Sequence, residues 1–439
     1  MRALLASMLL LGACRVTATF DCTTSMDCRE GAVTGVCEAN HACAFADTTC
    51  ASGLRYDELA SDQSAANQCV GAVGKVPGCE TWHPHFFMPC DLPAPLGPFT
   101  LQPGQYVYDT DSDVLSGGAA VPHASTVLAQ GDGSMIRVLS VTSLTVPAQT
   151  RVQVTGSLPL IVASWSDITV AGLIDAGSSK FGTVGGGAGA FMCEPAVPGM
   201  DPTPTGGSGG GGGGGYQGAG GKGGNGDKGN TPGGAGGGST GTPKYVRAGC
   251  PGERSGAAGV AATAPALQTT FAPGGLGGGA VQLAAKTSIT ISGIVFASGS
   301  GGGGAPIGSG VGGGGGGSGG FVGLDAPTVD LSGYLLAVGG GGGGGGFPAA
   351  NPGSAGQAGS DVLFMPGRIM GGQSNCGGGG GDANNNLLLP GTDGTNAMSN
   401  MCGGGGGGGG GGYTLVWSPA FTSTPAMTLT APPVIVNPL

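Results

Sequence analysis

Alternating apolar and polar positions recur in three short segments of the chain. Residues 168–176, 289–297 and 329–337 each place aliphatic side chains at alternate positions and carry a glycine at the fifth position. In a β-strand, such alternation puts one set of side chains on a single face. Each segment follows a second apolar run that begins 11 or 12 residues before its glycine, at Ile161, Val281 or Val322. The repeating unit is therefore predicted to be two strands and a turn.

Stacking the three units would align their aliphatic rows in one ladder, in which no unit buries its apolar face alone. The internal glycines, Gly172, Gly293 and Gly333, suit corners where a strand bends. The pattern predicts an all-β fold built as a parallel β-helix-like solenoid, with a β-sandwich of similar strands as the alternative. No window has the sustained 3.6-residue apolar period of a helix, so we expect almost no helix.

Long glycine runs separate the strand segments. Glycine supplies 102 of the 439 residues, whereas charged residues make up 9%. Glycine runs usually act as flexible linkers. Here they follow matching points of the repeat, and glycine chains can form an extended helix of three residues per turn whose backbone groups pair with neighbouring chains. We therefore expect polyglycine II-type insertions, with flexible linkers as the alternative, in residues 209–215, 312–317, 339–346, 377–381 and 403–412.

The first residues have the pattern of an export signal. Arg2 precedes an apolar run over residues 3–11, which is too short to span a bilayer. The run ends in Leu-Gly-Ala-Cys, which resembles the bacterial lipobox. Residues 1–13 are therefore predicted to be a lipoprotein signal peptide, and Cys14 is predicted to carry the lipid. Cleavage after Ala18, which would release an unlipidated protein, is the alternative.

The other twelve cysteines form an even set, which indicates disulfides and an oxidising compartment. Eight of them lie before position 91, and their pairing cannot be read from their spacing. The last four flank Gly-rich insertions, and we expect Cys193 to pair with Cys250 and Cys376 with Cys402. The predicted disulfide cysteines are Cys22, Cys28, Cys37, Cys43, Cys50, Cys69, Cys79, Cys90, Cys193, Cys250, Cys376 and Cys402.

Cysteine and charge divide the chain after the signal peptide. Residues 19–90 form a Cys-rich acidic module, residues 91–180 a β-rich segment, and residues 181–439 a Gly-rich β-solenoid body. Residues 21–113 hold thirteen acidic and three basic side chains, whereas residues 255–360 hold one lysine and two aspartates. A body with so little charge cannot hold a phosphate backbone by electrostatics. We therefore expect no nucleic acid among its partners.

Catalytic motifs are weak in this sequence. Residues 206–210 and 316–320 match the G-x-S-x-G nucleophile pattern. At this glycine content such matches arise by chance, and no helix follows either of them. No catalytic residue and no cofactor are predicted.

Two residue groups have partial metal-site patterns. Asp109, Asp111 and Asp113 have the spacing of a calcium loop, but valine and alanine occupy the glycine and glutamate positions that the loop requires. A solvated acidic turn is the favoured interpretation. The set Cys79, His83, His85 and Cys90 contains zinc-ligand atoms, but disulfide-bonded cysteines are favoured in an exported module. No metal site is predicted.

The chain as a whole resembles a known kind of protein. The lipobox, the C-x5-C-x8-C-x5-C spacing of residues 22–43, the Tyr-Asp-Thr-Asp-Ser-Asp phrase of residues 108–113 and the Gly-rich insertions resemble Gly-rich, Cys-rich surface lipoproteins that are abundant in myxobacteria. The resemblance covers nearly the whole chain, and its motifs are compositional. It implies a bacterial cell envelope location, at the outer membrane or cell surface, with a lipid anchor in the membrane. It implies no catalytic residues.

The favoured function is therefore a non-catalytic cell-surface structural or adhesion lipoprotein, whose partner would be a glycan or another cell surface. A β-helix enzyme acting on polysaccharide is the alternative, although its catalysis would need clustered charged groups that the body lacks. Recognition by a neutral body would use exposed apolar and aromatic groups. Of the candidates for this role, Leu387, Leu388 and Leu389 could instead fold back as a cap on the solenoid. The surface-contact candidates are Leu387, Leu388, Leu389, Tyr216 and Phe347.

Overall fold

The computed structural model of the protein describes residues 19–25, 27–31, 33–38, 41–47, 50, 54–60, 66–67, 78–179, 182–188, 193–202, 206–257, 270–306, 308–347, 369–383, 390–423 and 434–436. The chain divides between residues 77 and 78 into two compact units. Cys79 and Cys90, which the sequence grouped with the N-terminal module, belong to the second unit.

The first unit is a small disulfide-bonded module. Its strands β1 (Arg29–Glu30) and β2 (Val33–Thr34) form one antiparallel pair, and β3 (Val36–Cys37), β4 (Cys43–Ala46) and β5 (Leu54–Tyr56) form an antiparallel sheet. Disulfides join Cys22 to Cys37 and Cys28 to Cys43. Cys50 is also disulfide-bonded, and Cys69 lies outside the described residues. The buried sulfur atoms supply most of a core that a module of this size cannot build from apolar side chains.

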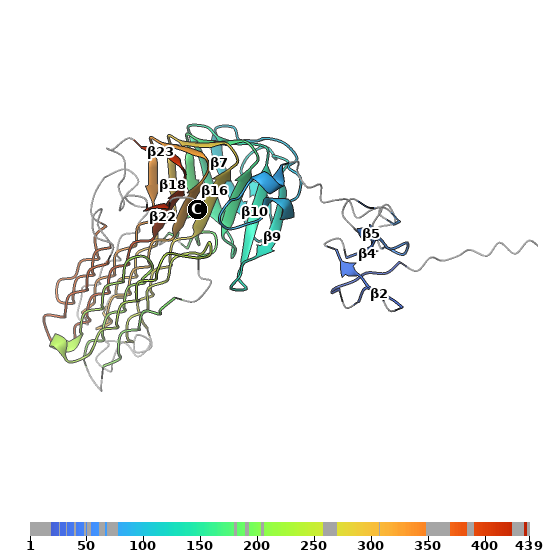
Figure 1. Cartoon of the computed structure of the whole chain (residues 1–439). Helices are drawn as coiled ribbons and strands as arrows, with labels where there is room; N and C mark the ends of the chain where they lie inside the picture. The colour runs from blue at the N-terminus through green and yellow to red at the C-terminus, as the bar shows by residue number, and fades with distance from the viewer. Residues whose placement is uncertain are drawn as a thin grey trace, which may run out of the picture. The chain divides into compact units, whose positions relative to one another are not determined.

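The second unit contains three sheets (Figure 1). Their strand orders are β24-β22-β19-β16-β13-β10-β9 in the first sheet, β23-β20-β17-β14-β11-β6 in the second and β21-β18-β15-β12-β7-β8 in the third. Neighbouring strands are parallel, except in the β9–β10 and β7–β8 pairs. Such parallel pairing differs from that of an antiparallel β-sandwich.

The strands of this unit are short. The first sheet contains β9 (Ala124–Ala129), β10 (Met135–Val141), β13 (Leu160–Ser164), β16 (Ala280–Ala285), β19 (Phe321–Asp325), β22 (Tyr413–Trp417) and β24 (Val434–Val436). The second contains β6 (Phe99–Thr100), β11 (Leu144–Val146), β14 (Asp167–Val170), β17 (Ser288–Ile291), β20 (Thr328–Leu331) and β23 (Ala420–Ser423). The third contains β7 (Gly104–Asp109), β8 (Val114–Ser116), β12 (Thr150–Thr155), β15 (Leu173–Asp175), β18 (Ile294–Phe296) and β21 (Tyr334–Leu336).

Each repeat contributes one strand to each sheet. The repeat therefore has three strands and not the two expected from the sequence. The difference arises at the internal glycine, where the predicted strand breaks in two. A β-carbon on Gly293 would overlap the carbonyl oxygen of Gly172, and one on Gly333 would overlap that of Gly293. The corner glycines therefore stack directly on one another and leave no room for a side chain.

The predicted aliphatic ladder is present in the register of the strands. Ile168 pairs with Ile289, and Ile289 pairs with Val329, in the second sheet. Ile174, Val295 and Leu335 align in the same way in the third. All six side chains are buried in one core between the sheets. Full burial of such a side chain contributes about 1.5–3 kcal/mol.

Helical structure is almost absent from the described residues. It consists of the 3-10 turns η1 (Cys79–Thr81), η2 (Pro89–Asp91) and η3 (Asp227–Gly229). None of the described helical segments is long and apolar enough to cross a bilayer. The strand-rich fold expected from the sequence is therefore confirmed.

The outer face of the first sheet is covered by residues 79–92, which a disulfide between Cys79 and Cys90 closes into a loop. Trp82 and Phe87 pack there in one cluster with Ile161 of β13 and Ala284 of β16. Burial on both faces explains why β13 and β16 are apolar along nearly their whole length. Of the described residues, Ile369 and Ala383 pack over β18 and β21 of the third sheet.

Glycine-rich runs extend side by side from the sheets of the second unit (Figure 1). The run 403–412 shows how they pair. Its N–H groups donate in rotation to three neighbours: those of residues 404, 407 and 410 to the run 208–214, those of 403, 406 and 409 to the run 340–346, and those of 405 and 408 to residues 395 and 392. Every third residue therefore faces the same neighbour.

The carbonyl groups of the same run accept hydrogen bonds from three further runs. These contain residues 313–319, 378–381 and 221–224. The donor–acceptor distances in both sets lie between 2.7 and 3.0 Å. The run 403–412 is thus bonded to six neighbours, which makes it a paired element of the fold.

Two disulfides enclose some of these runs: one encloses 208–214 and 221–224, and the other encloses 378–381. Cys193 pairs with Cys250 and Cys376 pairs with Cys402, as the positions of these cysteines predicted.

Candidate functional site

The structure places the predicted contact residues in different environments. Cys14 and Leu387, Leu388 and Leu389 lie outside the described residues. Phe347 is half-buried at the end of its glycine run.

Tyr216 was predicted to be a surface contact, and this prediction is wrong. The side chain is fully buried. Its ring packs edge-on against Tyr413 with a centroid distance of 4.9 Å, and the guanidinium of Arg247 lies 5.3 Å from its centroid. Its hydroxyl donates to the carbonyl of Arg247 at 3.0 Å. Tyr216 therefore fixes the junction between a glycine run and the first sheet.

The acidic turn of residues 109–113 uses its carboxylates locally. Asp109 accepts the backbone N–H groups of Asp111 at 2.9 Å and Ser112 at 3.1 Å. Asp113 accepts the hydroxyls of Tyr108 at 2.7 Å and Ser125 at 2.5 Å. Burial favours the protonated acid, but these hydrogen bonds outweigh it and lower the pKa of Asp113. The carboxylates of Asp109 and Asp113 therefore bind different groups of the protein, as expected of a hydrogen-bonded turn.

Three of the four zinc-type residues, Cys79, Cys90 and His85, have other partners. Cys79 and Cys90 are bonded to each other. The Nδ1 atom of His85 lies 3.1 Å from a carboxylate oxygen of Asp325. The same oxygen accepts the backbone N–H of His85 at 2.8 Å. The disulfide interpretation of these cysteines is therefore confirmed.

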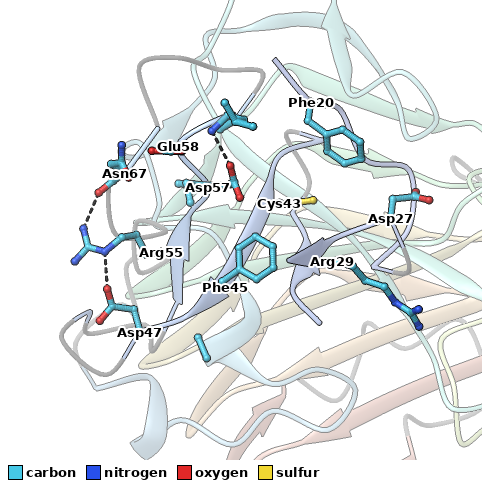
Figure 2. A pocket seen from close by; sticks show the side chains of 14 residues that line it. Phe20, Asp27, Arg29, Cys43, Phe45, Asp47, Arg55, Asp57, Glu58 and Asn67 are labelled. Carbon is cyan, nitrogen blue, oxygen red and sulfur yellow. Dashed lines mark hydrogen bonds and ion pairs between the residues drawn. The ribbon is translucent and has the colours of Figure 1, made fainter. Parts of the chain in front are cut away.

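The first unit has a pocket of about 650 Å³ (Figure 2). On one side of Phe45, Arg55 donates to Asp47 at 2.5 Å and to the carbonyl of Asn67 at 2.6 Å. Asp27 and Arg29 lie on the other side of the ring in this view.

Two carboxylates of this pocket accept hydrogen bonds from nearby backbone N–H groups. Asp27 accepts the backbone N–H groups of Thr23 and Thr24, which lower its pKa to about 2. Asp57 accepts the N–H of Leu59 at 2.7 Å. These contacts hold the turns of the module together.

The second unit has a larger groove along the outer face of the third sheet. Its volume is about 870 Å³. One row of side chains, from adjacent strands in register, runs along it: Gln105, Arg151, Leu173, Ile294 and Tyr334. Four steps between strands cover about 19 Å. We call this feature the third-sheet groove.

The charged side chains among the described lining of the groove are Arg151 and Asp175, and they bind each other. Arg151 donates through Nε to Asp175 at 3.1 Å and also through Nη2. Gly177 donates its N–H to the other carboxylate oxygen at 2.9 Å. Burial raises the pKa of Asp175, although the hydrogen bonds from Arg151 and Gly177 oppose this. The described lining therefore has no net charge when both groups are ionised.

The sequence did not single out these groove residues. Gln105 and Arg151 precede the recognisable repeats, and the polar residues of the row differ from strand to strand. The groove residues alternate with buried residues along each strand, which indicates that one face of each strand points outward. Only the register of the strands places the groove residues in one row.

Comparison with protein-family models, with curated proteins and with solved structures finds no match for this chain.

Proposed function

We propose that the protein is a non-catalytic structural or adhesion lipoprotein of a bacterial cell surface, anchored in the membrane by a lipid on Cys14. In this proposal the three sheets are the faces of a parallel β-helix-like solenoid. Successive units deliver strands to the three sheets in the same order, and each strand pairs in parallel with its counterpart in the next unit. Successive turns of a coil would produce this pairing.

The glycine runs are, in the same proposal, a polyglycine II bundle. A helix of three residues per turn presents every third residue to the same neighbour. The run 403–412 has this periodicity and bonds six other runs. This network of hydrogen bonds between the runs is the observation that carries the proposal. Each net hydrogen bond contributes about 0.5–1.5 kcal/mol, and together they stiffen a projection built almost entirely from backbone.

A polysaccharide-cleaving enzyme remains the second candidate. Glycoside hydrolysis generally uses two carboxyl groups at the scissile bond. The described lining of the third-sheet groove offers one, that of Asp175, and it is bound to Arg151. This arrangement supports a binding role over hydrolysis.

The anchoring part of the proposal can be tested by labelling cells with a palmitate analogue. The Cys14→Ser variant should lose the label and move from the membrane fraction to the soluble fraction. The matched control is Ala18→Gln, which alters only the alternative cleavage site and should keep the label. Labelling of the Cys14→Ser variant would contradict lipidation at this residue.

The adhesion part needs a separate measurement. Beads coated with the purified chain should bind cells or cell-wall fragments, whereas beads coated with a heat-unfolded sample should not. Equal binding by both samples would contradict recognition by the folded protein.

A further inference from the structure

The third-sheet groove presents hydrogen-bonding groups that have no partner among the described residues. The side-chain amides of Gln105, Gln149 and Gln153 make no hydrogen bond to any described residue, nor does the hydroxyl of Tyr334. Each amide offers two donor hydrogens and an acceptor oxygen. The groove thus has several free polar groups that can both donate and accept.

These polar groups flank an apolar floor. Leu173 and Ile294 are adjacent in register and half-buried, and the half-buried Tyr334 follows Ile294 in the same row. A surface that combines apolar contact with a few directed polar groups is typical of ligand sites. A pyranose ring has matching chemistry, since it carries hydroxyls that donate and accept around an apolar face of C–H groups.

The charge of the groove limits the class of ligand. Arg151 and Asp175 neutralise each other, and Asp175 is buried. A polymer with a charge on every repeat would find no net counter-charge among the described lining residues. An uncharged chain fits this lining better than a uronic acid polymer or a nucleic acid.

The geometry favours a glycan over a peptide. An extended peptide usually binds a sheet by pairing its backbone with an exposed edge. The third-sheet groove instead lies on a face, where β12, β15 and β18 are each bonded to strands on both sides. Side chains are therefore the main contact groups there. A row of about 19 Å is long enough for several sugar residues.

The backbone at Gln149 adds an independent observation. This residue lines the groove, is exposed, and has a φ of 63°, in the left-handed region that favours glycine. Non-glycine residues held there cost free energy and often mark functional positions. A glutamine at this position places an amide at the rim where glycine would satisfy the backbone better.

We propose that the third-sheet groove binds an uncharged polysaccharide chain that runs across the strands, along the row from Gln105 to Tyr334. The free amides hydrogen-bond to sugar hydroxyls, and Leu173, Ile294 and Tyr334 contact the apolar faces of the rings. This inference rests on the proposed adhesion function and names the ligand class of that function.

Affinity electrophoresis of the purified full chain tests the proposal. The probes are soluble neutral polysaccharides (a β-1,3-glucan, a β-1,4-glucomannan, a xylan and a dextran), with polygalacturonate as the charged probe. We expect at least one neutral polymer to retard the protein and polygalacturonate to have little effect. Retardation by polygalacturonate alone, or by no polymer, would overturn the proposal.

Two variants locate the site. Gln149→Gly removes the rim amide and suits the left-handed backbone, so its melting temperature should stay the same or rise while affinity falls severalfold. Tyr334→Ala should weaken binding about tenfold or more, and Tyr334→Phe should retain more of it. The matched control is Thr290→Ala, in the outward row of the second sheet, which should bind as the parent does.

Parent-like binding by the Gln149→Gly/Tyr334→Ala double variant would overturn the assignment to this groove. That failure is distinct from failure of the proposed function. If the double variant lost neither cell binding nor lipid labelling at Cys14, adhesion would stand and the groove would not be its site.

Discussion

Gly407 donates its backbone N–H to the carbonyl oxygen of Gly211 at 2.9 Å. A β-carbon on Gly407 would overlap the carbonyl of Gly221, in a third run. The N–H of Gly407 is therefore bonded to one neighbouring run while its α-carbon is in tight contact with another. Glycine is required here because of this close approach, and the same holds along most of the run 403–412.

The Gly407→Ala variant should consequently be destabilised. Forcing extra atoms into a packed site usually costs about 1–3 kcal/mol. The matched control is Gly379→Ala, because a β-carbon there would meet its nearest neighbour, the carbonyl oxygen of Gly372, at an ordinary contact distance of 3.6 Å. Calorimetric melting should show a clear loss for the first variant and little change for the second. Equal melting temperatures of the two variants would contradict the close packing of the glycine runs.

Removal of the disulfides should also weaken the bundle. Cys376 and Cys402 are 26 residues apart, and the loop-entropy model gives about 3–4 kcal/mol for their bond. The 57-residue separation of Cys193 and Cys250 gives about 0.7 kcal/mol more. Replacing both cysteines of a pair with serine should therefore lower the free energy of unfolding more for Cys193 and Cys250 than for Cys376 and Cys402. Chemical denaturation measures this difference. The reverse order, or no loss in either variant, would argue against the loop model for these bonds.

The stability of the first unit should depend on pH through Asp27. Its pKa is about 2 in the folded chain because the backbone N–H groups of Thr23 and Thr24 stabilise the carboxylate, whereas its ordinary value is 3.8. A lowered folded pKa contributes stability that is present above about pH 4 and is lost as the pH falls toward 2.

Carboxyl NMR shifts of the native protein should titrate for Asp27 near pH 2. In the Asp27→Asn variant, the stability of the first unit should depend less on pH between 4 and 2. A titration midpoint near 4 would mean that the two N–H contacts do not favour the charged form.

The pair of Arg151 and Asp175 should show the opposite pH dependence. Burial raises the folded pKa of Asp175 above its unfolded value, so stability is lost as the pH rises through the folded pKa. Arg151→Met should raise that pKa further and leave a buried carboxylate without its cation. Breaking a buried pair costs about 3–5 kcal/mol, and the partial exposure of Arg151 reduces this to about 1–3 kcal/mol.

The double variant Arg151→Met/Asp175→Asn tests that explanation. It should recover much of the stability lost at neutral pH, because no charge is left in the buried position. Denaturant unfolding at several pH values measures this. A double variant as unstable as Arg151→Met at all pH values would contradict the role assigned to the carboxylate.

The aliphatic ladder could be predicted from the sequence because its signal is local. Ile168, Ile289 and Val329 occupy the same position in similar phrases, and in-register stacking needs no further information. The environment of Tyr216 could not be predicted, because Tyr413 and Arg247, which bury it, are distant in the sequence. The third-sheet groove was missed for a related reason, since Gln105 and Tyr334 are joined in one row only through the register of three intervening strands.

The central claim is that the glycine runs form an ordered hydrogen-bonded bundle, and amide hydrogen exchange of residues 403–412 tests it most directly. These N–H groups donate to three neighbouring runs, so exchange should be orders of magnitude slower than in an unstructured glycine peptide, as expected for hydrogen-bonded amides within a stable fold. Protection comparable to that of the buried strands β16 and β19 is the predicted result. Exchange at the rate of an unstructured peptide in native buffer would contradict the account.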